Sequence, residues 1–408
     1  MIEFSNFSIP LLLGYAELHY HLKYLYPKYY IKQPEIIADC PIRVIKNKDN
    51  VLPILLIIKD SNKFPILLKS IKVTIKYADK KIEEFFPKTK KIEQSYYSET
   101  IKCNLGIIES EQNLKVIVEI NISCLGKDYT IINDNCPGLD KKPFTCYYAN
   151  AALPYPNGWY AGDPHCHTIY TADQVEFGAD IKSTKTMAKA MGLSWFFVTD
   201  HSYDLDDSLN DCTKNDINLP KWNMMKADCV EEDEPDFRVV PGEEVSIGNK
   251  NGENVHLLVI NKNEFIHGSG DSAEIWFKNK PEHCLNELKN ETEDEIYIAA
   301  HPNDKVPFMQ KLTLRRGSWH TEDFSDNKIR FMQVINSADI SEIKSSIEYW
   351  KNLLIQKHKI LILAGNDAHG NFNVMRQIQK PFTKLFASDK QVFGRMHTVF
   401  HYRNNDPI

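Results

Sequence analysis

The sequence lacks the features of a secreted, disulfide-bonded protein. Its nine cysteines are scattered, are odd in number and include no C-x-x-C pair, which argues against a disulfide framework and for reduced thiols in a cytoplasmic protein. The first residues, MIEFSNFSIPLLLGYAEL, contain a short apolar run but neither a basic n-region nor an A-x-A-like cleavage site. A secretory signal peptide is therefore not expected.

Long apolar runs and an excess of positive charge are also missing. Runs such as VLPILLII are far too short to span a bilayer. The 408 residues carry a formal net charge of −6, which argues against general affinity for nucleic-acid backbones. We therefore expect neither membrane nor nucleic acid among the partners. A locally positive pocket for one anionic small molecule stays open.

The first part of the chain is rich in short β-like segments. Between residues 40 and 150, stretches such as NLKVIVEINISC are rich in Ile and Val, alternate in places and are broken by polar turns, a pattern typical of strands. Helical periodicity is not evident there. We predict a β-rich, sandwich-like domain over residues 1–150, in which the tyrosine-rich residues 1–39 form a strand or an extended arm.

The pattern changes after ANAALPYPNGWYAGDP, a connector that contains Pro, Asn and Gly. Short apolar runs then alternate with helix-like stretches such as DIKSTKTMAKAMG, SAEIWFKNKPEHCLNELKN and DISEIKSSIEYWKNLLIQKHK. This alternation predicts a mostly parallel α/β domain over residues 151–408.

Side chains that can bind metals stand beside most of these apolar runs. They are Asp200 and His201 after WFFV, Glu243 and Glu244 in RVVPGEE, His256 at the start of NVHLLVI, His301 after YIAA, and Asp367 and His369 after LILA. In a β/α barrel the working residues come from the carboxyl ends of the strands. Each motif alone is weak, but their recurrence predicts convergence on one metal centre.

The stretch GDPHCHTIYTAD contributes two further imidazoles. If it is extended, Asp163, His165 and His167 share one face and Cys166 points to the other. Two imidazoles on one face can reach a single metal ion, and Asp163 could orient one of them. Cys166 is expected to be a packed thiol rather than a ligand.

Taken in order, the motifs HxH, TDH, G-x-E-x-S, HxL, AHP and D-A-H resemble those of the PHP superfamily, named for polymerase and histidinol phosphatase. The resemblance covers about residues 158–375. The sequences of two segments, GDPHCHTIYTADQVEFGADI and AGNDAHGNFN, are similar to those of the carbaryl-hydrolase-like branch. The resemblance implies a distorted (β/α)7 barrel that binds two or three divalent metal ions, here preceded by the β-rich N-terminal domain.

The resemblance also implies which residues hold each ion. They are His165, His167 and Asp367 for the first ion, with Glu244 bridging to a second ion held by His256 and His301, and His201, His369 and Asp173 for a third. Glu243 is the neighbour of the bridging carboxylate. Glu244, Asp367 and His201 are the residues expected to serve catalysis directly.

The resemblance also implies metal-dependent hydrolysis, best suited to a phosphoester on a small phosphorylated molecule. Water held between two ions loses a proton near neutral pH and becomes the nucleophile, and the ions stabilise the charge that develops. Imidazole-rich sites favour Zn, Mn or Fe over Mg. For the phosphate itself we single out Arg376, after the last motif, and Arg315 and Arg316, in a loop that also carries Lys305, because a guanidinium group matches phosphate geometry.

Other functions fit parts of the same pattern. The metal centre could hydrolyse a carboxyl ester, an amide or a carbamate instead. An amidohydrolase barrel also begins with HxH, but it usually needs a bridging Lys, a position that Glu244 fills better here. A non-catalytic, metal-stabilised binding protein is the third alternative. A purely structural ion would favour a closed shell of four ligands, which these motifs do not suggest.

Overall fold

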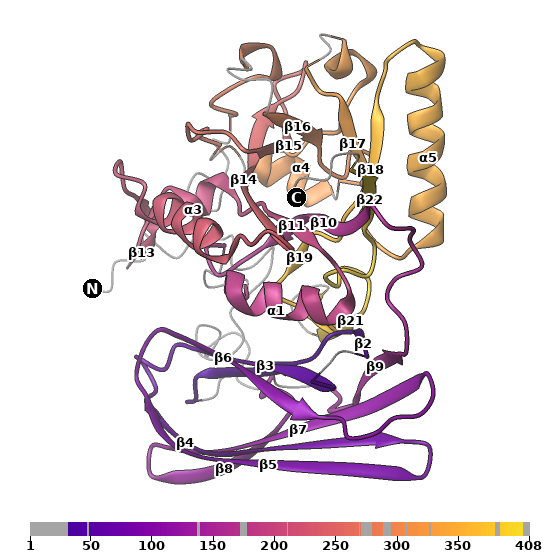
Figure 1. Ribbon diagram of the computed structural model, residues 1–408. Helices are drawn as coiled ribbons and strands as arrows, with labels where there is room; N and C mark the ends of the chain where they lie inside the picture. Colours follow the sequence, from indigo (N-terminus) through magenta and orange to yellow (C-terminus); the bar gives the residue numbers. More distant parts are fainter. Residues whose placement is uncertain are drawn as a thin grey trace, which may run out of the picture.

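The computed structural model describes residues 32–46, 49–136, 139–171, 178–209, 211–268, 270, 280–288, 295–306, 308–325, 328–379 and 384–402. Residues 1–31, most of the predicted N-terminal strand or arm, lie outside the described residues. The chain forms a lower, strand-rich half and an upper half that contains the helices (Figure 1).

The lower half consists of two β-sheets. The smaller sheet has the order β1 (Glu35–Asp39), β3 (Val51–Lys59), β6 (Tyr96–Asn104). The larger sheet has the order β2 (Arg43–Ile45), β9 (Phe144–Ala149), β7 (Gln112–Cys124), β4 (Ile66–Tyr77), β5 (Lys80–Ile92), with β8 (Lys127–Ile132) also paired to β7. All neighbours are antiparallel except β2 and β9. The β-rich character predicted for this region is present.

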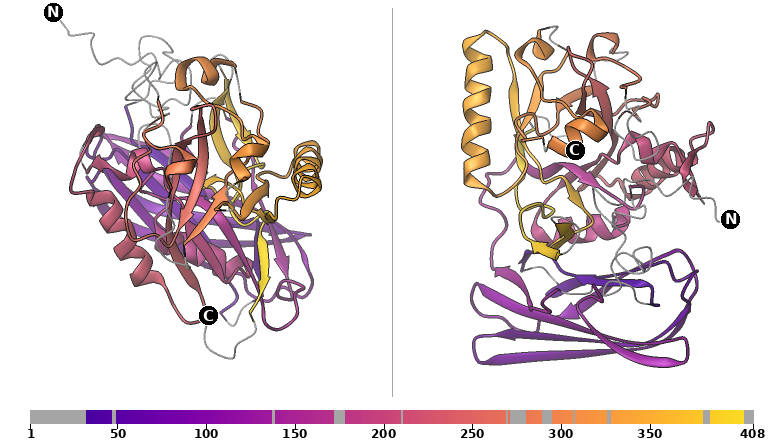
Figure 2. Two further views of the ribbon diagram at one scale, coloured as in Figure 1. Left: turned by 90° about the horizontal axis from the view of Figure 1, so that it is seen from above. Right: turned by 180° about the vertical axis from the view of Figure 1, so that it is seen from behind.

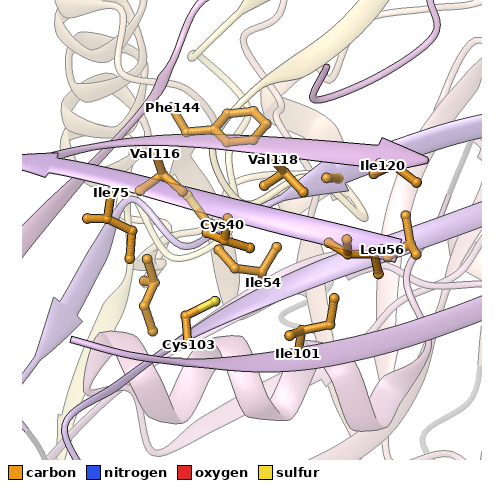
Figure 3. Packing of buried hydrophobic residues seen from close by; sticks show 14 of the residues in the cluster. Cys40, Ile54, Leu56, Ile75, Ile101, Cys103, Val116, Val118, Ile120 and Phe144 are labelled. Carbon is orange, nitrogen blue, oxygen red and sulfur yellow. The ribbon is translucent and has the colours of Figure 1, made fainter. Parts of the chain in front are cut away.

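The two sheets share one hydrophobic core, which Figure 3 shows. In β7 every second residue is buried, among them Val116, Val118 and Ile120, because alternate side chains of a strand point to opposite faces. They meet Ile54 and Leu56 of β3 in the same cluster. The outer edge strand β5 is mostly exposed and rich in Lys and Glu, which protects a free edge from pairing with other chains.

The apolar run VLPILLII forms strand β3. Its residues are almost all apolar because both faces of the strand are covered. Ile54 and Leu56 face the lower core, whereas Leu55 and Ile57 belong to the core of the upper half. Their partners there include Met187 and Ala188 of helix α1 (Ile181–Met191). Figure 1 shows α1 lying between the smaller sheet and the upper strands. A strand buried on both faces has no need to alternate.

The upper half is built on a nine-stranded mixed sheet. Its order is β18 (Leu361–Ala364), β17 (Phe331–Ile335), β16 (Ile296–Ala299), β15 (Asn254–Ile260), β14 (Arg238–Gly248), β11 (Trp195–Val198), β10 (Trp159–His167), β19 (Ala368–His369), with β22 (Thr398–His401) on the other part of β10. The last strand, β19, follows β18 after only three residues, 365–367. The sheet is therefore curled like a half-barrel, and this short connection joins the strands at its two ends.

This topology corrects the expected (β/α)7 barrel. Strand β15 is antiparallel to both β14 and β16, and β22 is antiparallel to β10. Five residues, 249–253, separate β14 from β15, whereas a parallel connection needs a crossover of about a dozen or more. The prediction of an α/β domain with a (β/α)7 barrel was wrong, because strands far outnumber helices in the described residues and the sheet mixes parallel and antiparallel pairs.

Helices cover less of the sheet than the sequence pattern suggested. The structure describes α1, α2 (Ser202–Leu205), α3 (Pro220–Glu232), α4 (Phe308–Leu314) and α5 (Ile340–Ile355). Of the helix-like stretch 272–290, residues 271–279 lie outside the described residues and 285–287 form a single 3-10 turn. Figure 2 shows α5, in orange, at one side of the upper half, where it packs against β17. None of the described helices is long and apolar enough to cross a membrane.

Two small hairpins complete the described structure. They are β12 (Asp207–Ser208) with β13 (Asp211–Asn215), and β20 (Met375–Gln379) with β21 (Lys384–Ser388). Polar contacts join the lower and upper halves beside α1. Arg43 of β2 donates to the carbonyl of Met191 at 2.9 Å, and Oδ2 of Asp39 accepts from the backbone of Phe372 at 2.9 Å. The halves are thus joined by packing and by buried hydrogen bonds.

Candidate metal centre

Eight of the nine predicted ligands gather at one rim of the curled sheet. His165 and His167 end β10, His201 follows β11, Glu244 lies in β14, and His301 follows β16. His256 lies near the start of β15, which runs in the opposite direction, so its first residues reach the same rim. The connection from β18 to β19 supplies Asp367 and His369, and His369 pairs with His167 in the ladder.

Glu244 lies at the middle of this group. Its Oε2 is 3.4 Å from Nε2 of His165, 3.2 Å from Nε2 of His167 and 3.1 Å from Nδ1 of His201. Its Oε1 is 2.5 Å from Nδ1 of His256 and 3.1 Å from Nε2 of His301. The two carboxylate oxygens therefore face two different sets of imidazoles.

Asp367 closes the first of these sets. Its Oδ1 lies 3.3 Å from Nε2 of His165 and 3.1 Å from Nε2 of His167. The ligand atoms fall into three overlapping groups, in each of which they lie within 4.8 Å of one another: His165, His167, Glu244 and Asp367; His201, Glu244 and His256; and His167, His201 and His369. These groups could hold a metal ion, as the sequence predicted.

The imidazole nitrogens and carboxylate oxygens of the site are arranged to bind a cation rather than to pair with one another by hydrogen bonds. Oε2 of Glu244 is buried and makes no well-aligned hydrogen bond within the described residues, although three imidazole nitrogens surround it. Nε2 of His165 and Nε2 of His167 approach to 3.2 Å. Nitrogen and oxygen atoms directed at a common point in this way are the arrangement that Zn²⁺ and related ions require.

The charges of the site also favour a cation. Burial alone would raise the pKa of Glu244, but His256, His165 and His201 hold it well below its ordinary value. Burial and His369 oppose protonation of His167, yet hydrogen bonds with Asp367 and Glu244 raise its pKa to about 9. A buried imidazole that retains a proton this firmly lies in a strongly negative potential, which would also attract a divalent ion.

Backbone strain marks two of the ligand positions. His301 has φ +29° and Asp367 has φ +51°, in the left-handed region that residues with a Cβ seldom adopt. Non-glycine residues persist in such conformations where the surrounding structure holds them, and they cluster at functional sites. His301 lies two residues after β16 and Asp367 immediately before β19, and their side chains turn toward Glu244 and the HxH pair.

Gln333 of β17, which the sequence reasoning missed, orients the first ligand. Nδ1 of His165 donates to Oε1 of Gln333 at 2.8 Å, which leaves Nε2 to face Glu244 and Asp367. Asp163, the residue predicted for this role, instead accepts hydrogen bonds from the backbones of His165, Asn366 and Gly394 and from the Asn366 amide. Cys166 points to the opposite side, where its thiol is buried and donates to the carbonyl of Phe197 at 3.3 Å.

The substitution Gln333→Leu is expected to lower metal affinity about 10–100-fold, because it removes the acceptor that fixes the ring of His165. Gln333→Glu keeps an acceptor at the same place and should restore most of the affinity. Titration of the apoprotein with Zn²⁺ or Mn²⁺ would measure both variants. Equal affinities for the leucine variant and the wild type would show that Gln333 does not position His165.

The remaining predicted residues are distributed unevenly. Arg316 reaches the site, with Nη1 at 2.5 Å from Nε2 of His256, whereas Arg315 is exposed. Glu243 faces the other side of β14, where it accepts from Ser202 and from the backbone of Ile266, both at 3.0 Å. Asp173, the proposed third-site ligand, lies outside the described residues.

Arg376 is not at the metal centre. Its Nε donates to Asp134 at 3.0 Å, its Nη2 donates to the carbonyl of Ala38 at 3.2 Å, and the guanidinium lies 5.9 Å from the ring centre of Phe144. This buried group joins the upper half of the molecule to the sandwich below. The expectation that Arg376 binds substrate is corrected, because its donors are used by the interface.

Comparison with known proteins does not add to this picture. No family model matches the chain, and no curated protein matches it. Among solved structures, the X-ray structure of Northeast Structural Genomics Consortium target SoR45 aligns with a TM-score of 0.21 and 14% sequence identity, over 31% of this chain and 91% of the other.

Proposed function

We propose that this protein is a metal-dependent hydrolase that cleaves a phosphoester of a small phosphorylated molecule. The observation that carries the proposal is the position of Glu244, whose two oxygens face separate sets of imidazoles. A carboxylate in that position can hold two divalent ions next to each other. The abundance of imidazole favours Zn, Mn or Fe.

Different residues of the site would hold different metal ions. His165, His167 and Asp367 would hold one ion, and His256 and His301 the other, with Glu244 between them. His201 and His369, whose ring centres lie 4.4 Å and 4.1 Å from that of His167, are the residues that would hold a third ion. Bound divalent ions would supply a Lewis acid and lower the pKa of water.

Arg316 is the feature that favours a phosphoester over a carboxyl ester, an amide or a carbamate. It is a permanent cation within hydrogen-bonding distance of His256, and its planar donors match the oxygens of a phosphoryl group. Glu244 and four of the six imidazoles, those of His165, His167, His201 and His256, are buried, and burial strengthens electrostatic contacts made there. Arg316 would thus bind the phosphoryl oxygens while water cleaves the P–O bond, to give the alcohol and phosphate.

The test compares ester classes on metal-restored protein. We expect hydrolysis of p-nitrophenyl phosphate, with little activity on p-nitrophenyl acetate, and loss of activity on chelation. Arg316→Met should lower kcat/KM for the phosphate about 10–100-fold, as expected for loss of one or two charge-assisted hydrogen bonds. The exposed neighbour provides the control variant Arg315→Met.

Two outcomes would contradict the proposal. Preferential cleavage of the acetate would assign the centre to carboxyl esters, amides or carbamates. Binding of metal without turnover of any ester, together with a loss of stability but not of activity in His165→Ala, would indicate a non-catalytic binding protein.

A further inference from the structure

A cavity of about 340 Å³ is lined in part by the residues that come after His301 in the chain. The segment that follows His301 forms one wall, with Asn303, Asp304 and Lys305, and Lys311 of α4 adds to it. Trp319 and Tyr349 contribute aromatic surface. A volume of this size is in the range of small-molecule sites.

The polar groups of this cavity are suited to an anion. Lys305 and Lys311 are both exposed and form no ion pair with any carboxylate in the described part of the chain, and Asp304 is the one acidic residue in the lining. Trp319 is 6% exposed, and its Nε1 has no hydrogen-bond partner among the described residues. Because an indole N–H can only donate, and buried donors are nearly always paired, this group lacks an acceptor.

Asp304 connects the cavity to the metal centre. Its Oδ2 lies 3.7 Å from Nδ1 of His301, and Nε2 of the same ring lies 3.1 Å from Glu244. Nδ2 of Asn336 lies 3.4 Å from the same oxygen of Asp304. The acidic group is therefore turned toward His301 and Asn336, and the two lysines are the remaining charges of the lining.

We infer that this cavity binds a second anionic group of the substrate, a carboxylate or a second phosphate, while the first phosphate is held at the metal centre. The inference rests on the proposed function and narrows it: the substrate class is a small phosphorylated molecule with a further acid group. The two lysines would pair with that group, and Nε1 of Trp319 would donate to one of its oxygens. Binding energy from a non-reacting part of a substrate can then raise the rate at the reacting part.

The experiment measures binding by calorimetry, on full-length protein with its metal restored. The probes are alkyl phosphonates that end in a carboxylate or in a second phosphonate, on chains of increasing length, with methylphosphonate as the single-anion reference. We expect at least one diacid to bind about 10-fold or more tightly than methylphosphonate, the effect of one charge-assisted hydrogen bond. The carboxylate and phosphonate series show which second anion is preferred.

The double variant Lys305→Gln, Lys311→Gln should remove this advantage and leave the affinity for methylphosphonate unchanged. Trp319→Phe keeps the aromatic surface and removes the donor, so it should reduce the advantage in part. The matched control is Lys351→Gln, at an exposed lysine of α5 that pairs with Glu348. Thermal unfolding of each variant separates a binding defect from a folding defect.

The failure of this inference differs from the failure of the proposed function. If methylphosphonate binds in a metal-dependent way but no diacid binds more tightly, or the lysine variant keeps the advantage, the cavity is not an anion subsite. If methylphosphonate does not bind to the metal-loaded protein and no phosphoester is cleaved, the proposed function itself is wrong.

Discussion

Replacing Glu244 with Gln is expected to lower phosphoester hydrolysis by more than about 100-fold and to reduce the metal content. Loss of a residue that only orients a ligand costs about 10–100-fold, and Glu244 contacts both sets of imidazoles directly. A neutral amide cannot balance two divalent ions. Elemental analysis of the purified variant, combined with a rate assay on p-nitrophenyl phosphate, would measure both effects.

The neighbouring residue supplies a matched control. Glu243 is equally buried but turns away from the imidazoles, and burial raises its pKa to about 8, against which its hydrogen bonds with Ile266 and Ser202 act. The side chain is therefore largely neutral at pH 7, and Glu243→Gln should retain the metal and the activity. Full metal content in Glu244→Gln, or equal losses in both variants, would contradict the central position of Glu244.

Replacing Arg376 with Met is expected to destabilise the protein by about 3 kcal/mol or more, without changing KM for a phosphoester. Removal of one member of a buried ion pair is strongly destabilising, and the buried Asp134 would keep only Lys141, whose side chain is partly exposed, as a cationic partner. Urea unfolding would measure the loss of stability. A higher KM with unchanged stability would instead indicate that Arg376 binds the substrate.

The same ion pair has a signature in its pH dependence. Burial alone would raise the pKa of Asp134, but Arg376 and Lys141 bring it below its ordinary value of 3.8. A lowered pKa in the folded state contributes stability that is present above the ordinary value and is lost as the pH falls through the lowered one. The stability difference between wild type and Asp134→Asn should therefore be largest near neutral pH and shrink below about pH 4.

The ligands could be predicted from the sequence because each lies beside its own apolar run. Residues at the carboxyl ends of parallel strands meet at one rim, and His256, near the start of β15, reaches the same rim because that strand is reversed. The convergence of His165, Glu244 and Asp367 thus did not depend on the correct topology. Gln333 also left a signal, since a glutamine in the middle of FMQVI is a polar group in a buried strand, and such a group needs a specific partner.

Topology and long-range partners were harder to predict. The segment NKNGE between β14 and β15 contains Asn-Gly, a strong signal for a hairpin turn, but the alternation of strands and helices elsewhere outweighed it. Arg376 was misassigned because its partner Asp134 lies 242 residues earlier in the chain. No local pattern distinguishes a guanidinium that binds substrate from one that neutralises a distant carboxylate.

Strand β3, with Ile54 turned to one core and Leu55 to the other, has a consequence for how this architecture can be inherited. Neither half of the molecule forms its hydrophobic core alone, because the two faces of β3 contribute to the two different cores. The sandwich is therefore not a detachable module that recombination could exchange freely. If the metal-binding half were fused to another protein, β3 or an equally apolar strand would have to be transferred with it.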